Sequence, residues 1–149
     1  MEKKKLVVLD DVSKHFKVEG GILKAVDHIN IDIRKGETLG LVGESGCGKS
    51  TLGKTIMGIY SPTTGSITYN GQESFKLSKK TLFKYSKMAQ IIFQDPYSSL
   101  DPRMTVGSII EEGMLIHKMY DKEKRQKRVY ELLELVGLNR EHANRFAHE

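Results

Sequence analysis

The first pattern of apolar and polar positions predicts a β-hairpin. Residues 6–16 and 25–33 are rich in β-branched side chains, and in the second run isoleucines alternate with Asn30 and Asp32. A period of two is typical of a strand that buries one face. The stretch 17–24, with its two consecutive glycines, connects the runs. We therefore expect two antiparallel strands joined by a turn.

Two shorter apolar runs, 38–42 and 88–93, lack this alternation. A continuous apolar run suits a strand that is covered on both faces, as in a parallel sheet, so both are predicted to be buried strands. Between them, residues 66–69 ahead of Asn70-Gly71 predict a strand that enters a type I′ turn. Ser78 is placed to cap a short basic helix.

Helical periodicity predicts three further elements. A helix over about 50–57 would end at Gly58. A second would begin after the N-cap Thr105, and a third would run from the N-cap Asp121 to Val136 and end at Gly137. The inward positions of the second helix would be Val106, Ile109, Ile110 and Gly113, and those of the third Val129, Leu132, Leu133 and Val136.

The change from a β-rich to a helical pattern predicts two subdomains within the chain. We place the boundary so that residues 1–96 hold the strands and an incomplete core, and residues 97–149 begin a helical subdomain.

Composition narrows the class of protein. The chain has 149 residues, of which 38% are hydrophobic and 29% charged, which is typical of one globular domain. Its single cysteine excludes a disulfide framework, and no apolar run approaches the ~20 residues that cross a bilayer. The start carries a basic flank without the apolar stretch of a signal peptide. We expect a soluble intracellular chain.

The net charge of +5 does not predict a nucleic-acid partner. The basic residues are spread over three stretches, and in the last of these Asp121 and Glu123 are interleaved with them, as on a solvated helix face. Aromatic residues stand singly, without a platform on which bases could stack. The histidines and Cys47 show no spacing typical of zinc ligands.

The motif with the clearest chemistry lies at residues 43–50, Gly-Glu-Ser-Gly-Cys-Gly-Lys-Ser. It matches G-x-x-x-x-G-K-[ST] between a predicted buried strand and a predicted helix, as a phosphate-binding P-loop requires. The glycines let backbone N–H groups turn toward a phosphate, and the helix start adds its positive dipole end. We expect Lys49 to reach the β- and γ-phosphates and the Ser50 hydroxyl to ligate Mg²⁺. This context disfavours the alternative of a glycine-rich turn that binds nothing.

Gln94 follows the predicted strand over 88–93, and Pro96 prevents that strand from continuing. In open α/β sheets, ligands bind beyond the carboxyl ends of the strands. Gln94 is therefore a candidate for contact with the metal or the attacking water. The alternative is an ordinary polar residue at a strand end.

Together these motifs resemble the ATP-binding subunits of ABC transporters, specifically their oligopeptide/dipeptide importer group. The resemblance covers essentially the whole chain as the N-terminal part of such a subunit. It rests on residues 25–27, 35–53, 94–106, 131–138 and 142–149.

The resemblance implies an α/β fold, with a P-loop NTPase core, an N-terminal antiparallel β subdomain and the start of an α-helical subdomain, truncated. It implies that Lys49 and Gln94 serve catalysis and that Ser50 and Gln94 hold Mg²⁺. Phe16 would stack on adenine, with His15 as the fallback. The remaining contacts to ATP would come from Gly43, Glu44, Ser45, Gly46, Cys47, Gly48, Lys49, Ser50 and Thr51.

The implied function is that of an ATPase subunit that couples ATP hydrolysis to oligopeptide or dipeptide uptake. Its partners would be membrane-spanning permease subunits and a second ATPase subunit, head to tail, at the cytoplasmic face of a prokaryotic membrane. The peptide cargo would not be contacted directly. Alternatives are an ABC ATPase for another small solute such as nickel, a soluble non-transport ABC protein, and a fragment that only binds nucleotide.

Some parts of the family's catalytic apparatus are not found in these 149 residues. They lack the signature Leu-Ser-Gly-Gly-Gln, the Walker B aspartate, the catalytic glutamate and the switch histidine. We expect the chain to bind ATP without appreciable turnover. Asp10-Asp11 follows an apolar run as a Walker B aspartate does, but it precedes the P-loop, so we interpret it as an ordinary strand end.

Overall fold

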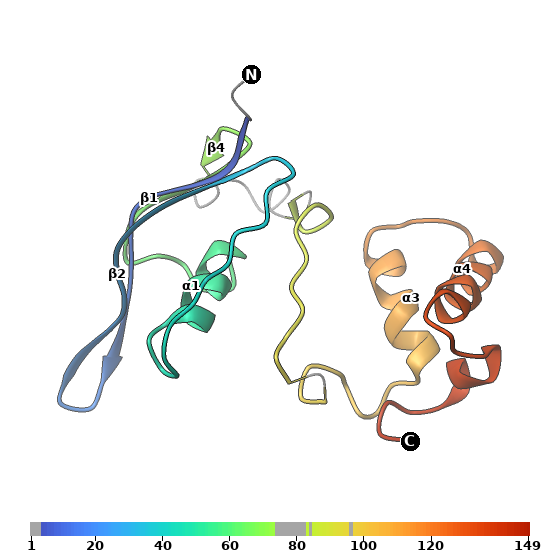
Figure 1. The fold of residues 1–149 in the computed structure, drawn as a ribbon. Helices are drawn as coiled ribbons and strands as arrows, with labels where there is room; N and C mark the ends of the chain where they lie inside the picture. The colour runs from blue at the N-terminus through green and yellow to red at the C-terminus, as the bar shows by residue number, and fades with distance from the viewer. Residues whose placement is uncertain (1–3, 74–82, 84, 96) are drawn as a thin grey trace. The chain divides into compact units, whose positions relative to one another are not determined.

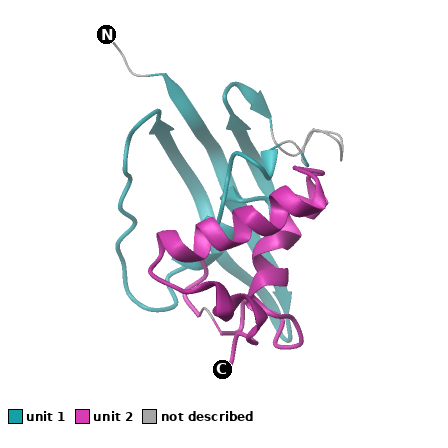
Figure 2. Cartoon of the chain, turned by 90° about the vertical axis from the view of Figure 1, so that its right-hand side faces the viewer, with its two compact units in different colours: residues 1–91 teal, residues 92–149 magenta. Residues whose placement is uncertain are grey.

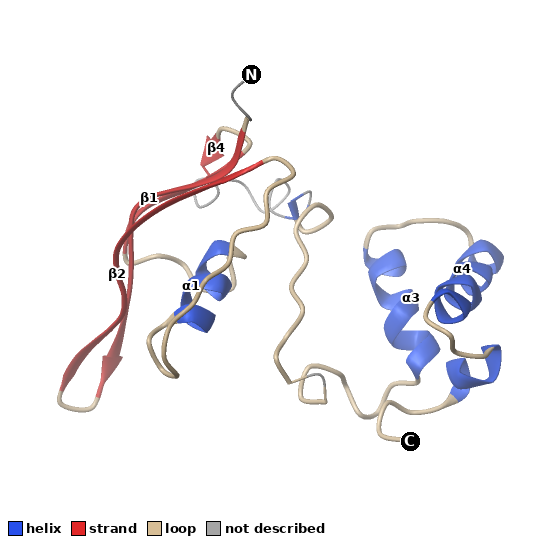
Figure 3. Ribbon diagram, in the orientation of Figure 1, coloured by secondary structure: helices blue, strands red, loops and turns tan. Residues whose placement is uncertain are grey.

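The computed structural model describes residues 4–73, 83, 85–95 and 97–149. The chain divides into two compact units, residues 1–91 and 92–149, which Figure 2 colours separately. All of the strands that are described lie in the first unit (Figure 3). The helix predicted to begin at Ser78 lies outside the described residues.

The first unit is built on a four-stranded antiparallel sheet with the order β2-β1-β3-β4. Its strands are β1 (Lys5–Val18), β2 (Gly21–Arg34), β3 (Thr64–Tyr69) and β4 (Gln72–Glu73). Figure 1 shows β1 and β2 as one long hairpin. The predicted hairpin is confirmed, and its strands are longer than expected because the turn takes only the residues between Val18 and Gly21.

The hairpin has a bulge in its middle. There Asp11 on β1 has a φ of 50°, and His28 on β2 has a φ of 53°. Side chains replace ladder bonds at this point: Asp11 N donates to Asn30 Oδ1 over 2.8 Å, and His28 N donates to Ser13 Oγ over 2.9 Å. Such bulges bend a strand without ending it. Because β1 continues to Val18, the interpretation of Asp10-Asp11 as a strand end is wrong.

A strand and a helix end where the sequence predicts, at Asn70-Gly71 and at Gly58. Between β3 and β4, Asn70 and Gly71 have φ values of 49° and 83°, the positive angles that a type I′ turn needs. Helix α1 (Lys49–Ile56) has Met57 as its C-cap, and Gly58 follows in the left-handed region with φ 74°. The expected strand, turn and helix stop are confirmed.

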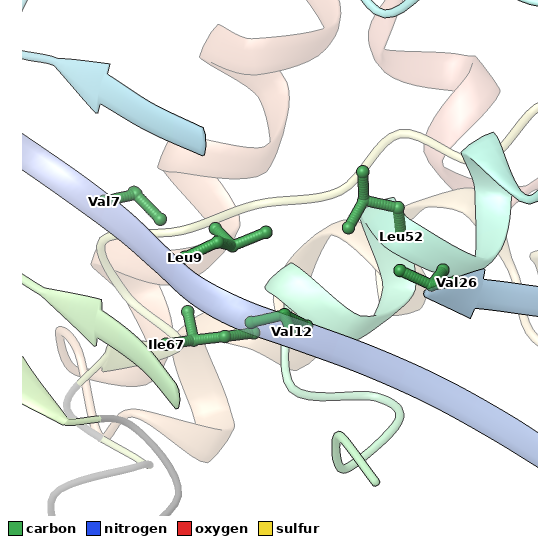
Figure 4. Close-up of a cluster of buried hydrophobic side chains, with 6 residues drawn as sticks. All are labelled: Val7, Leu9, Val12, Val26, Leu52 and Ile67. Carbon is green, nitrogen blue, oxygen red and sulfur yellow. The ribbon is translucent and has the colours of Figure 1, made fainter. Parts of the chain in front are cut away.

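The core of the first unit lies between the sheet and α1. Its buried side chains come from three strands and the helix, as Figure 4 shows: Val7, Leu9, Val12, Val26, Leu52 and Ile67. Leu52 is the contribution of α1, whose first residue, Lys49, belongs to the P-loop motif. This packing holds the helix start, and with it the end of the loop, against the sheet.

The two continuous apolar runs, 38–42 and 88–93, are not strands, so those predictions are wrong. Their side chains are largely exposed, with Val42 at 94% and Ile92 at 96% of full exposure. A strand exists only where a neighbour completes its hydrogen-bond ladder. None of the described strands pairs with either run.

The second unit packs two helices and a 3₁₀ turn: α3 (Val106–Ile116), α4 (Lys122–Leu135) and η1 (Arg140–Asn144). Both predicted N-caps are confirmed. Thr105 Oγ1 accepts from Ser108 N and Asp121 Oδ1 accepts from Lys124 N.

The core of this second unit differs from the predicted stripes at four positions, because Ile109 and Leu132 are half-buried outside it and Gly113 and Val136 are exposed. It consists of Met114, Val129, Leu133 and Ala143, with Val106, Ile110 and Tyr130 packed against them. Gly113 is exposed and Met114 is buried instead, because Met114 follows Ile110 by one helical turn. Val136 is 70% exposed, since it is the C-cap and lies beyond the last helical residue.

Candidate functional site

The loop over 43–48 turns sharply before it enters α1. Gly46 and Gly48 have φ values of 81° and 94°, and Cys47 N donates to Glu44 O over 3.4 Å. A Cβ on Gly48 would lie 2.0 Å from the carbonyl oxygen of Ala25 in β2. Only glycine allows so close an approach at a positive φ. The loop is therefore seated directly on the edge strand β2.

The Lys49 ammonium closes over the mouth of this loop. Its Nζ donates to Gly43 O over 2.7 Å and also to Glu44 O, and it lies 3.4 Å from Cys47 Sγ. The cation is thus held where two backbone carbonyls converge, without a carboxylate partner among the described residues. An ammonium in this position is available to an incoming anion.

The start of α1 leaves backbone donors beside that ammonium. Its N-cap, Gly48, makes no side-chain hydrogen bond, and its first turn has no acidic residue. The bond from Leu52 N to Gly48 O closes the first turn, so the amides of Lys49, Ser50 and Thr51 precede the helical ladder. Uncapped amides and the positive end of the helix dipole together favour a bound anion.

The residues present fit Mg²⁺ in the form that accompanies a nucleotide. Ser50 is exposed in the first turn of α1, next to Lys49. Mg²⁺ usually keeps several waters and takes one or two protein oxygens together with substrate phosphates. No cluster of three or more His, Cys, Asp or Glu side chains suited to a metal is found among the described residues. One hydroxyl beside a phosphate site meets the need of such an ion.

Phe16 lies on β1 opposite Leu23, in the same unit as the loop, and is half-buried. The alternative residue for stacking on adenine, His15, is held by a carboxylate: its Nε2 donates to Asp27 Oδ1 over 2.9 Å. This hydrogen bond, followed by the one from Lys24, lowers the pKa of Asp27 below its usual value. His15 is therefore bound to a carboxylate, whereas Phe16 is not.

Gln94 belongs to the second unit, whereas the loop over 43–48 belongs to the first. It is exposed at a bend. The neighbouring Asp95 Oδ1 accepts from Tyr97 N over 3.0 Å and from Ser98 N over 3.3 Å. Hydrogen bonds from the side chain and backbone of Ser98 lower the pKa of Asp95. This turn starts directly after Gln94.

One residue of the site region was missed at the level of sequence. Tyr60 meets Phe16 edge to face, with ring centroids 5.4 Å apart. A lone tyrosine after a helix stop carries no local signal of such a contact, because the two residues are far apart along the chain.

A model of the ABC transporter family matches residues 26–149. The chain belongs to this family. The match contains the loop over 43–50 and Gln94, whereas Phe16 lies ahead of it.

Relatives within the ABC transporter family are about half identical to this chain over the aligned residues. It is 53% identical over 147 residues to the oligopeptide transport ATP-binding protein OppF of Bacillus subtilis (strain 168), covering 97% of this chain and 48% of that protein. It is 46% identical to the OppF protein of Streptococcus mutans serotype c, covering 99% of this chain and 48% of that protein. The chain spans about half the length of these relatives. The resemblance to this group is confirmed.

Solved structures of the family confirm the predicted fold class. A dimeric ATP-binding cassette, MJ0796, in a post-hydrolysis state with ADP and phosphate, superposes with a TM-score of 0.81 at 28% identity, over 96% of this chain and 62% of that one. CbiO1 of Clostridium perfringens, part of an ABC transporter complex, superposes with a TM-score of 0.71 at 25% identity, over 99% of this chain and 55% of that one. Among the described residues, no helix has the length and apolarity needed to cross a membrane.

Proposed function

We propose that this chain is the ATP-binding part of an ABC importer subunit that couples ATP hydrolysis to the uptake of oligopeptides or dipeptides. The observation that carries the proposal is the Lys49 ammonium, held by the Gly43 and Glu44 carbonyls at the uncapped start of α1. A cation and free amides that converge in this way suit a polyphosphate. The names of the relatives, oligopeptide transport ATP-binding proteins, support the choice of nucleotide and cargo.

The proposed roles follow the positions of the residues in the loop. Lys49 would leave its carbonyl partners and bind the β- and γ-phosphates, while the amides over 43–51 surround the phosphate chain. Ser50 would supply a hydroxyl to Mg²⁺, which neutralises phosphate charge when bound. Phe16 would stack on the adenine base. Gln94 would contact Mg²⁺ or the attacking water and report nucleotide state to the transport machinery.

The proposed partners are membrane-spanning permease subunits and a second ATPase subunit arranged head to tail, at the cytoplasmic face of a prokaryotic membrane. The dimeric state of the MJ0796 cassette supports the second of these. The peptide cargo would not contact this chain. We also propose that residues 1–96 form the β subdomain and P-loop core and that 97–149 begin the helical subdomain.

The 149 residues would supply a phosphate cradle and the Mg²⁺ contacts of Ser50 and Gln94, but they lack the family's catalytic glutamate. Phosphoryl transfer to water also requires a group that orients the nucleophile. We therefore expect this chain to bind MgATP with little turnover. A steady-state phosphate-release assay checks this, and a turnover typical of complete ABC ATPases would contradict it.

Binding is tested by calorimetric titration of MgATP into the wild type and Lys49→Ala. Hydrogen bonds to charged groups contribute about 1.5–3 kcal/mol, so the substitution should weaken binding about 10- to 100-fold. Lys35→Ala is the matched control, since Lys35 is exposed at the turn after β2. Equal dissociation constants for the wild type and Lys49→Ala would overturn the proposed function.

A further inference from the structure

Two aromatic rings and two ammonium groups alternate beside the loop helix in the first unit. Lys14 Nζ lies 5.0 Å from the centroid of Phe16 and 5.8 Å from that of Tyr60. Lys54 Nζ also lies 5.8 Å from the Tyr60 centroid. The order is therefore Phe16, Lys14, Tyr60, Lys54, and each member contacts the next.

These two ammonium groups are directed at rings and not at acids. Neither Lys14 nor Lys54 makes an ion pair within the described part of the chain. All four side chains are half-buried. A cation over an aromatic ring gains about 0.5–2 kcal/mol, most where water is partly excluded. The cluster is thus held by interactions that orient the rings.

Hydrogen bonds attach the segment that follows Tyr60 to β1. Thr63 N donates to Ser13 O over 2.7 Å, and His15 N donates to Thr63 Oγ1 over 2.9 Å. They hold residue 63, three positions after Tyr60, beside the strand that carries Phe16. The two rings meet edge to face, with an interplanar angle of 83°.

The cluster also includes a residue of the helix that follows the phosphate loop. Lys54 lies in the last turn of α1, and α1 begins at Lys49. Tyr60 follows the end of the same helix. The helix that carries the phosphate loop therefore contacts the Phe16 ring through Lys54, Tyr60 and Lys14.

We propose that Tyr60 is a positioning residue for Phe16, which it holds in one orientation for stacking on a purine base, with Lys14 fixing both rings. This inference rests on the proposed function. A ring that is already oriented loses less conformational entropy when the base binds, so Tyr60 increases affinity for the base and not for the phosphates. Edge-to-face ring pairs contribute about 0.5–1.5 kcal/mol beyond burial.

The test compares two ligands, MgATP and magnesium tripolyphosphate, which has the phosphates without the base. Tyr60→Leu should weaken MgATP about 3- to 10-fold and leave tripolyphosphate within about 2-fold of the wild type. Tyr60→Phe keeps the ring and should restore MgATP binding. Lys14→Met should weaken MgATP about 2- to 3-fold. The control is Tyr85→Leu, which removes a ring from a different pair, Tyr69–Tyr85, at 5.7 Å.

A spectroscopic signal reports stacking directly. The triphosphate of 2-aminopurine riboside loses fluorescence when its base stacks, and the chain contains no tryptophan that would add to the signal. The wild type and Tyr60→Phe should quench this nucleotide at saturation, and Tyr60→Leu should quench it less. A side chain that only stabilised the fold would not change the quenching of bound nucleotide.

The outcomes separate the two proposals. Equal loss of MgATP and tripolyphosphate binding in Tyr60→Leu, or no loss of either with unchanged quenching, overturns the role of Tyr60. A wild type that binds tripolyphosphate as tightly as MgATP also overturns it and leaves the phosphate site intact. A wild type that binds neither ligand overturns the proposed function, and the positioning role with it.

Discussion

His28 and Asp11 face each other across the β1–β2 bulge, with His28 Nδ1 2.7 Å from Asp11 Oδ1. Both residues have positive φ, so the pair joins the two points at which the hairpin leaves regular strand geometry. The hydrogen bond to Asp11, and then the charge of Asp11, raise the pKa of His28 above 6.5. Asp27 adds to this effect, while Lys24 opposes it.

We predict that this pair makes stability depend on pH in a defined direction. Because the folded state raises the pKa of His28, it binds the proton more tightly than the unfolded chain. The stabilisation is complete below pH 6.5 and is lost as the pH rises through the raised pKa. In urea unfolding from pH 5.5 to 8.5, the free energy of unfolding of the wild type should exceed that of Asp11→Asn by the largest margin at the lowest pH.

The variant suits this comparison because Asn tolerates positive φ and preserves the backbone at the bulge. Glu19→Gln, in the turn of the hairpin, is the matched control for loss of one carboxylate. A stability difference between the wild type and Asp11→Asn that stays constant over this pH range would show that His28 does not titrate against Asp11.

A second prediction concerns Gly48. Alanine there places a Cβ 2.0 Å from Ala25 O at φ 94°, so the loop must move off β2. We expect Gly48→Ala to lose at least about 1–2 kcal/mol of unfolding free energy and most of its affinity for MgATP. Chemical denaturation and calorimetric titration measure the two effects.

Gly53→Ala provides the matched comparison for this loop. Gly53 lies inside α1 with no atom within 4 Å of an added Cβ, and alanine favours a helix over glycine by about 0.5–1 kcal/mol. This variant should be at least as stable as the wild type and bind MgATP equally well. A Gly48→Ala variant that behaved like Gly53→Ala would contradict the seating of the loop on β2.

A third prediction separates two leucines of α4. Leu133 is 1% exposed in the core of the second unit, whereas Leu135 is 80% exposed. Leu133→Ala should cost about 2–5 kcal/mol of unfolding free energy, because it removes buried surface and leaves a cavity. Leu135→Ala should change it by less than about 0.5 kcal/mol. Equal losses in the two variants would mean that the inward face of α4 is assigned wrongly.

The sequence predicted the elements whose signals are local. The Asn70-Gly71 turn, the stop at Gly58 and the Thr105 cap all act through residues a few positions apart, and each is confirmed. The form of the loop over 43–48 is local as well, since Gly46 and Gly48 have positive φ, and its role in binding phosphate stays a prediction. Backbone geometry and short-range hydrogen bonds suffice to specify such features.

The tertiary structure decided what depends on a distant partner. The apolar runs 38–42 and 88–93 are hydrophobic enough for strands, but a ladder needs a neighbour that no local pattern reveals. The contact of Tyr60 with Phe16 and the approach of Gly48 to Ala25 likewise join residues that are remote along the chain. The sequence by itself therefore determined the turns, the helix ends and the local form of the loop over 43–48. Only the packing of sheet and helix decided where that loop sits and which aromatic ring lies beside Phe16, because long-range contacts form between surfaces and not between neighbours in sequence.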